Sequence, residues 1–95
     1  MNKYELALVV SPELDEENLA QLVNKITQWI TDGAGQVIKV DNWGKRRLAY
    51  TLRKYRDGVY LFVQTEMEPQ SVVVLERNLN IAEPVLRHLV IRLEE

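Results

Sequence analysis

The order in which strand-like and helix-like patterns follow one another restricts the fold of this chain more than any other feature of its sequence. In a strand, successive side chains point to opposite faces, so apolar residues recur at every second position. Tyr4, Leu6, Leu8 and Val10 show this alternation. The β-branched residues of 37–40 favour a strand by propensity. The predicted strands span residues 4–10, 36–52, 59–67 and 85–93.

Two further segments have the apolar spacing of helices. The first spans residues 15–32, with Asp15 as its predicted N-cap. It should end at Gly33, which we expect to adopt the left-handed conformation. The second begins at Pro69, a residue favoured at the first helical position, and is followed by an exit turn at 80–84. The helix residues expected in the core are Leu19, Leu22, Val23, Ile26, Ile30, Leu75 and Leu79.

These elements follow the order strand, helix, strand, strand, helix, strand, which is the split βαβ arrangement of α+β proteins. The order predicts a four-stranded antiparallel sheet with two helices on one face. Residues 1–95 suffice for one domain with one core. We expect the central hairpin to turn at Arg56-Asp57-Gly58. Gly44 should mark a bulge or kink in the first strand of that hairpin.

The helices should leave one face of the sheet open. On the last strand, alternation assigns Leu89 and Ile91 to one face and His88 and Arg92 to the other. A shift of register by one residue would exchange the two faces. The side chains expected on the open face are those of Tyr60, Phe62, His88 and Arg92.

Composition argues against several classes of function. The chain has no Cys, so it has no disulfide, no thiolate metal site and no Cys nucleophile. Because it also lacks phosphate-binding glycine motifs and metal-ligand spacings, we expect neither an enzyme nor a cofactor. His88, the single histidine, should be structural or solvent-facing.

Two further ligand classes are disfavoured. Acylphosphatases share this fold class, but Ser11-Pro12-Glu13 stands where that family has an Arg-bearing phosphate loop, and Glu13 would repel phosphate. No small-molecule substrate is therefore expected. No apolar run approaches the roughly 20 residues of a membrane span, so no membrane partner is expected either.

The densest group of positive charges lies in residues 44–54, GKRRLAYTLRK. Between residues 42 and 56 there is no Asp or Glu, yet this stretch holds six of the twelve Lys and Arg residues. Since the net charge is −2, the positive field is local. Two interpretations remain open: a solvated edge strand whose cations block aggregation, and a surface for an anionic partner. Leu48, Ala49 and Tyr50, inside the run, suit a protein contact.

Tyr60 and Phe62 provide a second signal. Exposed aromatic residues on the third strand of this fold class stack RNA bases in RNA-recognition motifs, but residues 56–63 lack the glycine-aromatic spacing of that motif. The two rings are equally suited to cover a partner protein or a neighbouring side chain. Two alternatives therefore remain open: a stand-alone module for single-stranded RNA, and a dimeric regulatory domain that binds a small metabolite.

The basic run also resembles a known signature. Residues 44–50, GKRRLAY, are similar to the signature of the family of bacterial small-subunit ribosomal protein six. The resemblance extends nearly end to end, through Tyr4-Glu5, Ser11-Pro12 and Val85-Leu86-Arg87. It implies a ferredoxin-like fold and a ribosomal location, in the cytoplasm or in an organelle. It also implies binding to the central domain of small-subunit ribosomal RNA, as a heterodimer with small-subunit ribosomal protein eighteen.

The resemblance further implies two sets of site residues. The residues implied for RNA binding are Lys3, Arg46, Arg47, Lys54 and Arg92. The residues implied for the protein partner are Leu48, Ala49, Tyr50, Tyr60 and Phe62. The net charge of −2 supports a composite surface independently, because a small acidic domain binds RNA poorly without a basic partner.

Overall fold

Six elements follow one another in the predicted order. The structure is a computed structural model that describes residues 1–93, so residues 94 and 95 of the predicted domain lie outside the described part. The elements are β1 (Asn2–Val10), α1 (Glu16–Asp32), β2 (Gln36–Leu52), β3 (Tyr55–Met67), α2 (Pro69–Ile81) and β4 (Val85–Arg92).

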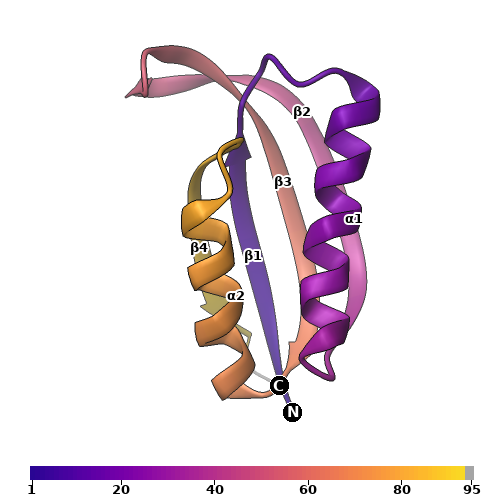
Figure 1. Cartoon of the computed structure of the whole chain (residues 1–95). Coiled ribbons are helices and arrows are strands. Elements are labelled where there is room, and N and C mark those ends of the chain that lie inside the picture. Colours follow the sequence, from indigo (N-terminus) through magenta and orange to yellow (C-terminus); the bar gives the residue numbers. More distant parts are fainter. Residues whose placement is uncertain (94–95) are drawn as a thin grey trace.

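The strands form one antiparallel sheet in the order β2-β3-β1-β4. β1 and β3 are the central strands, and β2 and β4 are the edges. Both helices lie on the same side of the sheet, with α1 nearer β2 and α2 nearer β4 (Figure 1). The predicted α+β architecture is confirmed.

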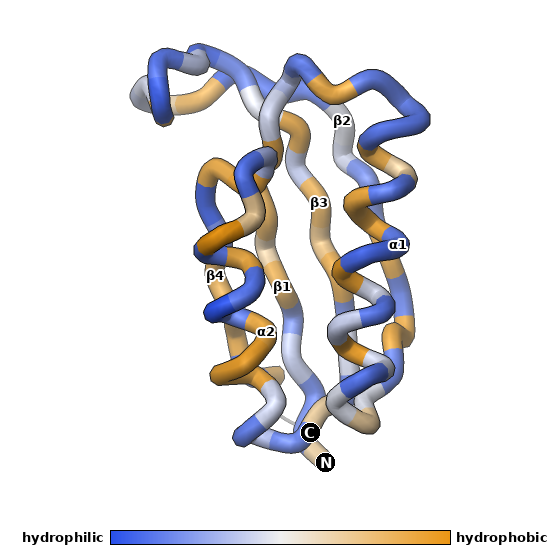
Figure 2. Tube along the Cα trace, in the orientation of Figure 1, coloured by the Kyte–Doolittle hydropathy of each residue, from blue (hydrophilic) through white to orange (hydrophobic). Residues whose placement is uncertain are grey.

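The core lies between the sheet and the two helices. The alternation predicted for β1 is confirmed, because Tyr4, Leu6, Leu8 and Val10 are all buried. Leu61 and its alternate neighbours on β3 face the same layer, and Figure 2 shows hydrophobic residues along β1 and β3 between the helices. The helix residues buried against them are Leu22, Ile26, Ile30, Leu75 and Leu79.

The first helix begins as predicted but ends differently. The Asp15 side chain accepts a hydrogen bond from the backbone N–H of Asn18 at 2.8 Å, which caps the first turn. Gly33 has a φ of −86°, whereas Ala34 has a φ of 63°, so the left-handed residue is Ala34. The prediction for Gly33 was therefore wrong. The next residue, Gly35, runs so close to β3 that an added Cβ would lie 2.7 Å from the carbonyl oxygen of Glu66.

Replacing Ala34 by Gly should stabilise the protein. An L-residue in the left-handed region costs roughly 1–2 kcal/mol, and this exceeds the entropy that glycine adds to the unfolded chain. We expect the free energy of unfolding to rise by about 0.5–1 kcal/mol in urea denaturation. Ala20→Gly, at an exposed position inside α1, is the matched control and should lower it by about 1 kcal/mol. Equal destabilisation by both changes would contradict this assignment.

The β2–β3 hairpin turns at Arg53-Lys54, and the predicted turn at Arg56-Asp57-Gly58 was wrong. Leu52 pairs with Tyr55, so two residues form the connection. Arg53 and Lys54 have φ values of 47° and 73°, as a type I′ hairpin turn requires at both central positions. The sequence did not indicate this turn, because neither Arg53 nor Lys54 is one of the Asn, Asp or Gly types that usually mark a type I′ turn.

Gly58 lies inside β3, where it permits a close approach to β1, and it is not part of the turn. It is buried, and a Cβ at this position would lie 2.5 Å from Cγ1 of Val9 on β1. Gly44 behaves as predicted: its φ is +78°, and the β2–β3 register shifts between Asn42 and Gly44. The extra residue at this bulge is Trp43.

The faces predicted for β4 are reversed. Val85 pairs with Val10 and Arg87 pairs with Val9, so Leu86 is an extra residue in a bulge. From that point the alternation is shifted by one residue. His88 and Arg92 lie opposite the core-facing residues of β1, on the side of the helices, and His88 Nε2 is 3.7 Å from the carboxylate of Glu76 on α2. Leu89 and Ile91 are instead exposed on the open face.

Candidate nucleic-acid interface

The central hairpin extends beyond the rest of the sheet. β1 ends at Val10, opposite Val59, whereas β2 and β3 continue to their turn. Among the described residues 1–93, residues 46–57, which we call the hairpin arm, therefore have sheet partners only within the hairpin. The arm bends across the end of the sheet toward the side of β4 (Figure 1).

The hairpin arm concentrates positive charge in an exposed position. It holds five cations and one acid, Asp57, which lies opposite Arg47 in the β2–β3 register. Figure 2 shows that most residues along it are hydrophilic. All five cations are exposed to solvent: Arg46, Arg47, Arg53, Lys54 and Arg56. This arrangement produces a local positive potential on a protein whose net charge is negative.

Trp43 holds Arg46 near the base of the hairpin arm. The rings of Trp43 and Phe62 lie 4.6 Å apart between centroids, at an interplanar angle of 52°. The guanidinium carbon of Arg46 lies 5.6 Å from the Trp43 ring centroid, within range of a cation–π interaction. Arg46 Nε also donates to the carbonyl oxygen of Trp43 at 3.4 Å. The guanidinium is thus oriented before any ligand arrives.

The open face of the sheet is apolar near the hairpin. Tyr60 and Phe62 lie on this face, as predicted, but they are half-buried where full exposure was expected. Together with Ala7, Val9 and Leu89 they line a groove of about 230 Å³. Leu89, which lines this groove, is 52% exposed. A groove of this kind suits an apolar side chain of a protein partner.

Arg87 links this groove to the hairpin arm. It lines the groove, and its guanidinium donates to the hydroxyl oxygen of Tyr50 at 2.6 Å. Of the other predicted partner residues, Leu48 is half-buried near Gly58 and Ala49 is exposed. The structure therefore brings Tyr50, Tyr60 and Phe62 into one region.

The predicted RNA-binding residues fall into two separate groups. Arg46, Arg47 and Lys54 share the hairpin arm. Lys3 and Arg92 lie at the opposite end of the sheet, since Val10 lies seven positions after Lys3 on β1, which corresponds to roughly 23 Å. Lys3 also lies opposite an acidic residue, Glu66, in the β1–β3 register, and Arg92 donates to the side chain of Asn2. One RNA helix that contacts the arm need not reach this second group.

Sequence reasoning missed two residues of this region, Trp43 and Arg87. Trp43 lies inside the acid-free run, next to the predicted bulge glycine, and is 55% exposed. An aromatic residue at this place in the basic run could have indicated that Trp43 belongs to the candidate interface. Arg87 was missed because only the Leu86 bulge turns it to the open face.

The described residues also bear on other kinds of site. Within residues 1–93, no group of three or more His, Asp or Glu side chains is arranged to hold a metal ion. No helix in this part of the chain is long and apolar enough to cross a membrane.

Comparisons with known proteins agree with this architecture. The crystal structure of ribosomal protein S6 from Thermotoga maritima superimposes with a TM-score of 0.90, at 25% identity, over 97% of this chain and 87% of that chain. The chain is 47% identical to small ribosomal subunit protein bS6 of Moorella thermoacetica, covering all of this chain and 97% of the relative. It is 42% identical to the bS6 protein of Clostridium acetobutylicum over the full length of both.

A family match covers almost the whole chain as well. The family described as ribosomal protein S6 matches residues 3–92, from the second residue of β1 to the last of β4. The basic hairpin, the split βαβ order and the full-length relatives thus agree, and the chain belongs to the ribosomal protein S6 family.

Proposed function

We propose that this protein is a structural constituent of the small ribosomal subunit that binds small-subunit ribosomal RNA in its central domain together with ribosomal protein eighteen. In this proposal residues 1–95 act as one RNA-binding domain that makes no chemical change to its ligand. Members of this bacterial family belong to the small subunit of the ribosome, and the cytoplasmic ribosome is where the protein acts.

The observation that carries the proposal is the separation of two surfaces on one end of the sheet. The exposed cations lie on the hairpin arm, where no other strand covers them. The apolar groove of Tyr60 and Phe62 lies on the adjacent open face. A cationic arm beside an apolar groove suits simultaneous contact with a phosphate backbone and with a protein. We assign Arg46, Arg47 and Lys54 to RNA, and Tyr50, Tyr60 and Phe62 to protein eighteen.

Electrostatics favour shared binding. Each phosphate contact contributes about −0.9 to the slope of the logarithm of the binding constant against the logarithm of salt concentration. If about four cations reach phosphates, this slope should be roughly −3.6. This is a modest contribution, and the net charge of −2 opposes it. A basic partner adds phosphate contacts and raises the effective concentration of the arm at the RNA.

The aromatic residues argue against a stand-alone module for single-stranded RNA. A base-stacking platform needs a free ring face, whereas Phe62 packs at 4.6 Å from Trp43. We therefore expect recognition of RNA shape and backbone more than of base sequence.

A gel-shift titration tests the proposal. The RNA is a central-domain fragment of small-subunit ribosomal RNA, and the titration is run with this protein alone, with protein eighteen alone and with both. We expect a tight shift only with both proteins. Tight binding by this protein alone to unstructured single strands would favour the stand-alone module, and no shift with both proteins would refute the proposal.

A further inference from the structure

The two strands of the hairpin arm are unequal in length. Arg47 pairs with Asp57 and Leu52 pairs with Tyr55. Between these pairs β2 has the four residues 48–51, while β3 has Arg56 alone. Extra residues on one strand bend a hairpin away from that side, which accounts for the curl of the arm over the sheet (Figure 1). A two-stranded ribbon of this kind is marginally stable by itself, so its position depends on other contacts.

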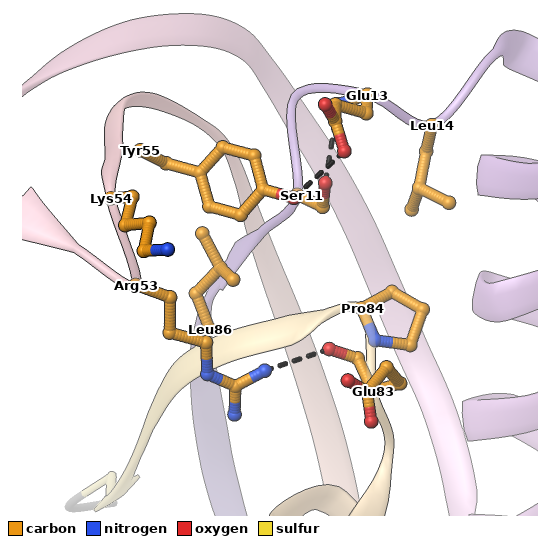
Figure 3. Close-up of a pocket in the computed structure, with 9 residues that line it drawn as sticks. All are labelled: Ser11, Glu13, Leu14, Arg53, Lys54, Tyr55, Glu83, Pro84 and Leu86. Atoms are coloured by element: carbon orange, nitrogen blue, oxygen red, sulfur yellow. Dashed lines mark hydrogen bonds between the residues drawn. The ribbon is translucent and has the colours of Figure 1, made fainter.

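Three side-chain contacts hold the arm in this position, and we call them the hairpin latch. The Tyr55 hydroxyl donates to Glu13 Oε1 at 2.8 Å, in the loop between β1 and α1. Arg53 donates to the carbonyl oxygen of Glu83 at 2.9 Å, in the loop between α2 and β4. The third contact is the hydrogen bond from Arg87 on β4 to Tyr50. Figure 3 shows the first two contacts on either side of one cavity.

The elements that receive the latch are themselves connected. The backbone N–H of Ser11 donates to the carbonyl oxygen of Pro84 at 2.8 Å, which joins the two loops. The Ser11 hydroxyl accepts a hydrogen bond from the backbone N–H of Glu13 at 3.2 Å. The arm therefore rests on a fixed base.

The turn of the arm, Arg53-Lys54, is exposed to solvent. A cavity of about 500 Å³ lies between the tip of the arm and the two loops, lined by Tyr55, Leu86 and Pro84 among others (Figure 3). Because the turn is not packed into the core, the polar contacts of the latch help to decide where the arm lies, together with the half-buried side chains of Leu48 and Leu52. Such contacts are exposed and individually weak, so they can hold a preferred orientation without making the arm rigid.

We propose that the hairpin latch preorganises the cations of the arm for RNA, with Glu13 and Tyr55 as positioning residues that do not touch the RNA. This inference rests on the proposed function. A mobile arm loses conformational freedom when it binds, and that loss lowers affinity, whereas a latched arm has already lost part of that freedom before binding. Glu13 is an acidic residue, yet in this proposal it favours binding of the anionic RNA, because it accepts the hydrogen bond from Tyr55 that holds the basic arm in place.

The test uses variants that separate the hydrogen bond from the charge. Glu13→Ala and Glu13→Gln remove the same negative charge, but only Gln keeps an acceptor for the Tyr55 hydroxyl. Tyr55→Phe removes the hydroxyl without any change of charge. Glu83→Ala is a further control, because Arg53 bonds to the backbone carbonyl of residue 83 and not to its side chain.

Each variant is measured by amide hydrogen exchange of the free protein and by titration of central-domain RNA in the presence of protein eighteen. Glu13→Ala and Tyr55→Phe should each speed exchange in residues 46–57 and weaken RNA binding by roughly two- to tenfold. The salt dependence of binding should stay unchanged, since the phosphate contacts form once the arm is in place. The double variant should be no weaker than either single variant, because both remove one contact.

Three results would overturn the proposal. The first is faster exchange in the arm with unchanged RNA affinity. The second is an equal effect of Glu13→Ala and Glu13→Gln, which would assign the effect to charge. The third is unchanged exchange in Tyr55→Phe. If the unaltered protein and protein eighteen fail to bind the RNA together, the proposed function fails and this inference fails with it. That failure is detected with the two unaltered proteins, so it is distinguished from a failure of the latch, which is detected only by comparing the variants.

Discussion

Replacement of both Arg46 and Arg47 by Ala should weaken binding of central-domain RNA by this protein and protein eighteen by roughly ten- to hundredfold. The estimate takes about 0.7–1.4 kcal/mol for each of the two lost contacts to phosphate, since both side chains are exposed to solvent. The slope of the logarithm of the binding constant against the logarithm of salt concentration should also become shallower by about two units, one for each lost phosphate contact. Gel-shift titrations at several salt concentrations measure both quantities.

A matched control separates local contacts from overall charge. Lys25→Ala with Arg77→Ala removes the same two positive charges from exposed positions on α1 and α2. We expect less than a threefold effect on binding, because surface charges farther than about 10 Å from the RNA are screened at ordinary salt. Equal losses in the two double variants would mean that Arg46 and Arg47 act only through net charge.

The second large effect concerns stability. Leu75 on α2 is 1% exposed, and Leu75→Ala should lower the free energy of unfolding by about 2–5 kcal/mol. This is a large share of the roughly 5–15 kcal/mol that stabilises a small domain. Thermal or urea unfolding followed by circular dichroism measures the change.

The neighbouring residue provides the control for this prediction. Val74 is 51% exposed on the same helix, so Val74→Ala should change stability by no more than about 0.5 kcal/mol. Similar losses for Leu75→Ala and Val74→Ala would show that α2 is oriented differently from the structure described here.

The element order was predictable because each segment carries its own periodicity. The two-residue alternation of β1 and the helical stripe of α1 are local patterns, and burial against each other follows from them. Asp15 and Pro69 were predictable for a similar reason, since helix starts depend on backbone groups within one turn.

Errors arose where distant segments decide the backbone. The turn lies at Arg53-Lys54, and Gly58 of the predicted turn instead lies inside β3, where it closely approaches Val9 on β1. Similarly, the bulge at Leu86 reversed the faces of β4 and moved Arg87 to the open face. A single extra residue reverses all later side chains in a strand, and nothing local in residues 85–93 reveals it.

The sequence by itself determined the α+β fold, the split βαβ order and the acid-free basic run, because local periodicity and charge do not depend on long-range contacts. Only the tertiary structure decided which cations lie together and which aromatic residues meet. It assigned Arg46 and Lys54 to the arm, separated Lys3 and Arg92 from them, and joined Tyr50 to Arg87. The physical reason is that strand register, bulges and the curl of an uneven hairpin depend on pairing between segments far apart in the chain.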